Sequence, residues 1–228
     1  MKKNENGLTL VELMIGLVVG AVVVGGAGAI YVTTIISSGS NLTTSKLNQE
    51  LSAVMQLMTN DIRRAGFGGD SFTAINISNT GSCVQYRYDL NLNGAVNTSN
   101  PNEQFGFGLN GDAIAMKKSA TGNCGSFNAL YWENITDDDL IEITAVNITT
   151  SGSTCIDASL NYNWRSGAET VFPCQPTAVN YSTRPNNLLV EARQLNIDIS
   201  ARLKADTSVT RSASAQIKIR NNRTLEAP

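Results

Sequence analysis

Residues 7–13 read Gly7-Leu8-Thr9-Leu10-Val11-Glu12-Leu13, and no charged residue occurs from Leu13 to Val32. As a helix rising about 1.5 Å per residue, this apolar stretch would span about 30 Å, which matches the hydrocarbon core of a bilayer. We therefore expect one membrane-spanning helix. Glu12 is the exception within it, because an unpaired carboxylate near the centre of a membrane helix costs about 2.5–3.5 kcal/mol. We expect this carboxylate to have a partner.

The order of segments distinguishes this anchor from a secretory signal peptide. A signal peptide places its small-residue cleavage site after the apolar stretch, whereas here Gly7 precedes it, behind a leader that carries Lys2 and Lys3. The sequence therefore predicts an anchor that stays with the protein. Gly16 and Gly20 fall on one helix face, with a spacing that lets a second helix approach closely.

The stretch from Gly7 to Glu12 resembles the N-terminal motif of type IV prepilins and type II secretion pseudopilins. The resemblance implies that a prepilin peptidase cleaves between Gly7 and Leu8 and methylates the new amino group of Leu8. Leu8 departs from the family, which usually has Phe there. Thr9 and Glu12 are then assembly residues, with the Glu12 carboxylate neutralising the terminal amine of an adjacent subunit. The alternative is that Glu12 only reaches to the lipid headgroups.

Helical periodicity returns after a polar segment at 37–41, with apolar residues recurring in steps of three and four. The stripe consists of Leu47, Leu51, Val54, Met55, Met58, Ile62 and Ala65. It predicts an amphipathic helix packed on a domain, ending at the glycine cluster 66–69. The expected divisions are a leader at 1–7, a membrane or filament-core helix at 8–36, its amphipathic second half at 37–69 and a globular β-rich domain at 70–228.

Short runs of alternating hydrophobicity follow residue 70 and predict antiparallel strands at 83–88, 140–144, 195–201 and 215–219. Asn93-Gly94 and Asn110-Gly111 are typical of hairpin turns. The expected fold class is α+β, with a type IV pilin-like arrangement of one long N-terminal helix on an antiparallel sheet and a loop-rich middle.

Two further segments narrow the resemblance. Residues 55–67 and 215–221 are similar to the helix end and the last strand of PilW-type minor pilins and of GspJ-type pseudopilins, and residues 86–94 and 103–107 favour the PilW type. The resemblance implies a role in type IV pilus assembly at the bacterial inner membrane, with a periplasmic C-terminal domain, and then at the pilus tip. Implied partners are the prepilin peptidase, the major pilin, minor pilins of the FimU, PilV and PilX kinds, and a PilY-type tip adhesin. Twitching motility, adhesion or DNA uptake would follow; a GspJ-like role in the pseudopilus tip is the alternative.

All four cysteines, Cys83, Cys124, Cys155 and Cys174, follow the membrane span, and none has the close spacing of a zinc or redox site. In an oxidising periplasm we expect disulfides, for which three sets of pairs are possible. We favour Cys83–Cys124 and Cys155–Cys174, because each bridge would close a long loop. Free buried thiols are the alternative.

One segment has half of a calcium-binding pattern. Asp89, Asn91 and Asn93, followed by Gly94, match the first half of an EF-hand loop, but Asn100 stands where a bidentate Glu is needed and Glu103 comes three residues later. A hairpin turn rich in Asp and Asn is the preferred interpretation. We expect no other cofactor.

The composition argues against enzymes and nucleic-acid binders. The chain has no His, which removes the commonest general base, and its scattered carboxylates predict no shared cleft. A membrane-anchored periplasmic hydrolase that uses Asp or Glu is the alternative from another class. With 17 Lys and Arg against 19 Asp and Glu, and no basic stripe, direct nucleic-acid binding is not expected.

Overall fold

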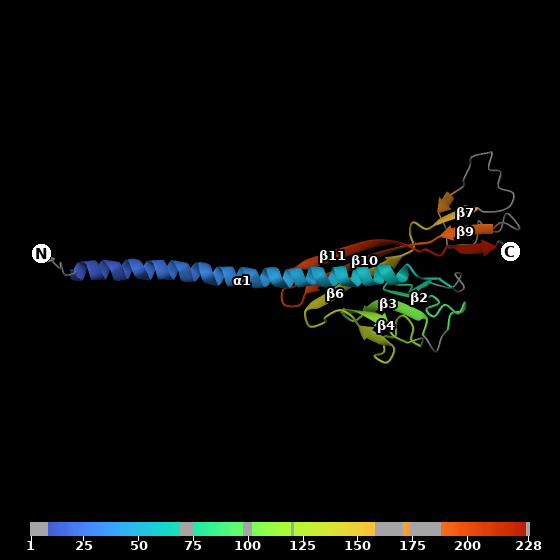
Figure 1. The fold of residues 1–228 in the computed structure, drawn as a ribbon, viewed down its shortest axis with the longest axis horizontal. Coiled ribbons are helices and arrows are strands. Elements are labelled where there is room, and N and C mark those ends of the chain that lie inside the picture. Colours follow the sequence, from blue (N-terminus) through green and yellow to red (C-terminus); the bar gives the residue numbers. More distant parts are fainter. Residues whose placement is uncertain are drawn as a thin grey trace, which may run out of the picture. The chain divides into compact units, whose positions relative to one another are not determined.

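The computed structural model describes residues 9–68, 75–97, 102–119, 121–157, 171–173 and 188–226. Within this part, one helix is followed by antiparallel strands, which confirms the expected α+β pilin-like fold (Figure 1). The elements are α1 Leu10–Ile62, β1 Ile75–Ile77, β2 Cys83–Arg87, β3 Gln104–Asn110, β4 Ala113–Lys117, β5 Trp132–Asn134, β6 Ile141–Thr149, β7 Thr154–Asp157, β8 Val171–Pro173, β9 Leu188–Ala192, β10 Gln194–Leu203, β11 Thr210–Lys218 and β12 Arg223–Glu226. The chain divides into two compact units, Met1–Lys46 and Leu47–Pro228.

The first unit contains the N-terminal part of α1, and its large apolar side chains are exposed. By length and composition, α1 is a helix that can cross a membrane. An apolar helix surface of this length that no part of its own unit covers needs lipid or other helices around it.

In the second unit, the last turns of α1 bury one stripe of side chains. The stripe contains Leu47, Leu51, Val54, Met55, Met58 and Ile62. This confirms the predicted amphipathic half, because the buried positions are the ones that recur in steps of three and four. Leu57, between two stripe positions, is 43% exposed.

The helix ends at Ile62, ahead of the expected boundary at residue 69. The backbone continues in turns whose N–H groups reach back three residues, as from Arg64 to Asp61 and from Phe67 to Arg64. Gly66 then adopts a φ of 79°, a left-handed conformation at which a right-handed helix ends. Its N–H donates to the carbonyl of Arg87 at 2.8 Å, so the chain leaves the helix by joining β2.

Three sheets are formed within the described residues, with strand orders β1-β2-β3-β4-β5, β11-β10-β6 and β12-β9-β7-β8. All their paired strands run antiparallel. The strands predicted at 83–88, 140–144, 195–201 and 215–219 correspond to β2, β6, β10 and β11.

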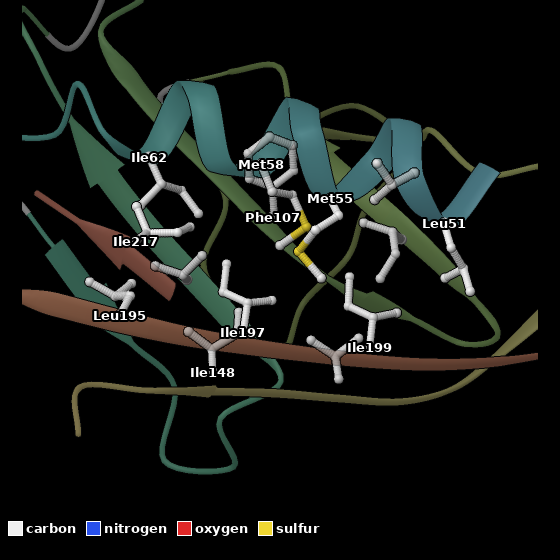
Figure 2. Close-up of a cluster of buried hydrophobic side chains, with 14 of the residues drawn as sticks. Leu51, Met55, Met58, Ile62, Phe107, Ile148, Leu195, Ile197, Ile199 and Ile217 are labelled. Atoms are coloured by element: carbon white, nitrogen blue, oxygen red, sulfur yellow. The ribbon is translucent and has the colours of Figure 1, made fainter. Parts of the chain in front are cut away.

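Strand β6 connects the first two sheets. Its Ile143 N–H donates to the carbonyl of Asp112 at 2.7 Å, and its Ile148 N–H donates to that of Gly81 at the same distance. The inner faces of both sheets and the helix stripe therefore form one core, in which Met58, Phe107 and Ile197 are buried together (Figure 2).

The two predicted hairpin turns have different outcomes. Asn110 pairs with Ala113, so Gly111 and Asp112 form a tight turn between β3 and β4, as predicted. Asn93-Gly94 does not form a tight hairpin, because it lies in the long connection from β2 to β3. Hydrogen bonds from backbone N–H groups to the Asp89 and Glu103 carboxylates shape that connection.

The burial of the helix stripe predicts how shortening one of its side chains changes the stability of the protein. Replacing Met58, which is 1% exposed, by Ala should lower the free energy of unfolding by about 2–4 kcal/mol, because a cavity would open in the core. Leu57→Ala on the adjacent, half-exposed position should cost less than about 1 kcal/mol. Chemical denaturation of the detergent-solubilised chain measures both values; equal losses would contradict the assignment of the buried face.

Candidate assembly site

The start of α1 is closed by reciprocal hydrogen bonds between Thr9 and Glu12. The Thr9 N–H and hydroxyl donate to Glu12 Oε2 at 3.1 and 2.9 Å, and the Glu12 N–H donates to Thr9 Oγ1 at 3.3 Å. This is a capping box, in which each side chain satisfies a backbone N–H of the first turn. Gly7 and Leu8, the expected cleavage pair, lie outside the described residues.

Gly16 and Gly20 lie on the helix with open space around them. A Cβ built on either glycine would meet no atom within 4 Å. Their small surface is therefore available to another helix, as their spacing predicts, and the helix-packing role stays a prediction.

At the other end of α1, the carboxylate of Asp61 joins the helix to β2. The Tyr88 hydroxyl donates to Asp61 Oδ1 at 2.8 Å, and the Tyr86 hydroxyl donates to Oδ2. The guanidinium of Arg64 lies 4.2 Å from the centre of the Tyr88 ring and 3.8 Å from Asp61 Oδ1. The sequence did not indicate this network, because the tyrosines also fit an ordinary alternating strand.

The two segments that carried the finer resemblance meet beside this network. The Arg220 N–H donates to the carbonyl of Arg63 at 3.4 Å, and Asn221 Nδ2 donates to that of Ala65 at 3.2 Å. The chain following β11 thus satisfies carbonyl groups at the end of the helix. This contact gives both segments a structural role within the domain.

The calcium candidates use their oxygens within their own loop. Asp89 accepts the N–H groups of Asn93 and Gly94, Asn91 Oδ1 accepts that of Asn93, and Asn93 Oδ1 accepts that of Ala95. These are the predicted turns held by Asp and Asn side chains, but they lie in a long connection and not in a tight hairpin. Calcium binding stays a prediction, and it would require these oxygens to leave the loop amides.

Buried Glu103 completes this connection. Its Oε1 accepts the N–H groups of Leu90 and Asn91 at 2.7 and 3.2 Å, and its Oε2 accepts that of Asn97. The Glu103 carboxylate therefore holds the backbone of a long loop in place. Because of these hydrogen bonds, Asn93-Gly94 does not form the tight hairpin turn that the sequence predicts.

The favoured first disulfide is present. Cys83 on β2 is bonded to Cys124, across a sequence separation of 41 residues. By chain entropy such a bridge contributes about 3–4 kcal/mol. Cys155 is also disulfide-bonded, but Cys174 lies outside the described residues, so that pairing stays a prediction.

The Asp61 network predicts a pH dependence of stability. Burial, followed by the charge and hydrogen bonding of Asp61, raises the pKa of both Tyr86 and Tyr88. The unfolded chain, with tyrosine pKa values of about 10, releases these protons first, so the free energy of unfolding should fall as the pH rises above about 10. Denaturation of the detergent-solubilised chain at stepped pH, with tyrosinate absorbance, measures this fall.

Two variants distinguish the network from general alkaline unfolding. Tyr86→Phe should make the fall in stability with pH smaller, because one of the coupled protons is gone. Tyr131→Phe, on a ring that packs against the separate cluster of Cys83, Ala115 and Trp132, provides the matched control. An unchanged pH dependence in Tyr86→Phe would contradict the role assigned to the network.

Two family models match the chain. The family described as "Prepilin peptidase-dependent protein B" matches residues 40–219, and the "Prokaryotic N-terminal methylation motif" matches residues 2–28. No curated protein and no solved structure matches it. The shorter match contains the capped helix start, and the longer one contains the helix stripe, the Asp61 network and most of the strands. The chain therefore belongs to the prepilin peptidase-dependent protein B family and is a type IV pilin-like minor pilin of a pilus or pseudopilus.

Proposed function

We propose that this protein is a PilW-type minor pilin that initiates type IV pilus assembly at the inner membrane and takes a place at the pilus tip. The observation that carries the proposal is the first unit, a capped apolar helix whose side chains are exposed. Lipid covers this surface before assembly, and the helices of neighbouring subunits cover it afterwards. The C-terminal unit faces the periplasm and then the cell surface.

The helix start is suited to pairing with a neighbouring subunit. In the capping box both hydrogen bonds from Thr9 reach Glu12 Oε2, and Glu12 Oε1 has no hydrogen-bond donor among the described residues. After cleavage by the prepilin peptidase between Gly7 and Leu8, a neighbouring subunit would present a positively charged methylated amine. Pairing this amine with Glu12 would offset the cost of each buried charge.

Minor pilins of the FimU, PilV and PilX kinds, the major pilin and a PilY-type adhesin are the proposed partners. Twitching motility, adhesion and DNA uptake would depend on this protein through the filament. Pilin-like families are generally structural, which supports assembly over the hydrolase alternative.

Deletion of the gene tests the function. We expect loss of most surface pili, measured by electron microscopy and by shearing, and restoration by a plasmid copy. Normal pili together with failed export of type II secretion substrates would overturn the PilW proposal and support a GspJ-like pseudopilin.

Two substitutions separate the charge of Glu12 from its capping role. Glu12→Gln keeps a side chain that can complete a capping box but removes the charge, whereas Thr9→Ala removes the cap and keeps the charge. We expect Glu12→Gln to be cleaved normally, but its amount in sheared filaments should be roughly tenfold lower than that of the wild type. This factor corresponds to the loss of an ion pair that contributes about 1.4 kcal/mol. Thr9→Ala should incorporate close to the wild-type level.

Immunoblots of membranes and sheared filaments provide the measurement, with cleavage read from the mobility of the chain. Equal incorporation of Glu12→Gln and wild type would contradict charge pairing. A defect in Thr9→Ala alone would assign the role of these residues to helix capping.

A further inference from the structure

The outer face of the β1–β5 sheet has a row of side chains that crosses four strands. Asn76 pairs with Gln85, and Gln85 pairs with Gly106. The pair Phe107–Met116 places Gly106 opposite Lys117. Because paired residues share a face, this row lies opposite the core face of Phe107.

Gly106 leaves this row without a side chain at its centre. A Cβ built there would lie 2.8 Å from the carbonyl oxygen of Val84 and 3.2 Å from Cη2 of Trp132. A pocket of about 120 Å³ lies beside this row. Its lining residues are Asn76, Gln85, Tyr86, Arg87, Gln104, Phe105 and Lys117.

Lys117 is the unusual member of the lining. It is only 4% exposed, and it has no hydrogen-bond or ion-pair partner among the described residues. Burial lowers the pKa of its ammonium group. The Lys117 stem is covered while its ammonium nitrogen keeps contact with solvent at the pocket. Partial loss of water around the charge has a cost that a suitable anion would offset.

The other lining residues favour a negatively charged group. The side-chain amides of Asn76 and Gln104 can donate hydrogen bonds to such a group. No carboxylate occurs among the lining residues that the structure describes. The small volume suits a group of a few heavy atoms.

We propose that this pocket binds a carboxylate group, with the Lys117 ammonium as its charged partner and the neighbouring amides as further donors. The carboxylate belongs either to a free small anion or to an acidic side chain. The site is independent of the helix start, and the proposal does not rest on the function proposed above.

The test follows the lysine signals of the full-length chain in detergent micelles. The chain is labelled with carbon-13 at the lysine ε carbons, and Lys117→Met and Lys118→Met assign the two adjacent signals by NMR. Acetate represents the free anion, and N-acetyl-glutamic acid amide represents an acidic side chain. Sodium chloride of equal ionic strength controls for screening.

We expect the Lys117 signal to shift saturably with acetate while the exposed Lys118 signal stays in place. Lys117→Met should weaken acetate binding, measured as the rise in unfolding temperature, by roughly tenfold or more, because a charge-assisted hydrogen bond is lost. Lys118→Met should bind as the wild type does. If the blocked glutamate also binds, the site accepts acidic side chains; if only acetate binds, it is a small-anion site.

A Lys117 signal that responds to neither compound, or responds equally to sodium chloride, would overturn the proposal. Unweakened binding by Lys117→Met would overturn it as well. Because Met has a similar length and removes only the charge, this variant should unfold at or above the wild-type temperature without acetate.

Discussion

The burial of one helix stripe is the constraint on which the C-terminal unit depends. From Leu47 to Ile62, α1 buries apolar side chains along one face, and polar side chains on a facing strand could not cover them favourably. The inner faces of two sheets meet this requirement together, joined through β6. Tyr86 of β2 and the isoleucines of β10 therefore alternate with outward-facing residues, since their strands contribute every second residue to the same core.

Polar contacts then fix where the stripe ends. Asp61 receives both tyrosine hydroxyls at the last turn of the helix, and Asn221 satisfies the carbonyl of Ala65 just beyond it. Polar groups in a partly buried region are costly to leave without a hydrogen-bond partner. These contacts therefore favour one position of the helix along the sheets. The N-terminal half of the same helix has the opposite character, because its apolar surface is left for lipid or for other subunits.

Local patterns made most of this architecture predictable. The helix stripe follows from its own periodicity, the strands follow from their alternation, and the N-terminal motif is a contiguous stretch. The capping box could also have been found, because Thr9 and Glu12 have the spacing that defines it. The Asn93-Gly94 prediction was wrong because Glu103, ten residues later, holds the loop amides and replaces the turn.

Contacts that depend on strand register could not be predicted in this way. The pairing of Asp61 with Tyr86, and the placement of Gly106 beside Lys117, both require knowing which residues face each other across strands. A register shift of one residue would reverse every side chain, and the sequence pattern alone does not determine the pairing of distant strands. The Lys117 pocket therefore emerges only from the assembled sheet.

Mass spectrometry of sheared, purified filaments tests the central claim most directly. If the protein is a processed filament subunit, the filaments should contain small amounts of a chain that begins at Leu8 with a methylated amino group. A chain that begins at Met1 and occurs only in the inner membrane, absent from filaments, would contradict the account.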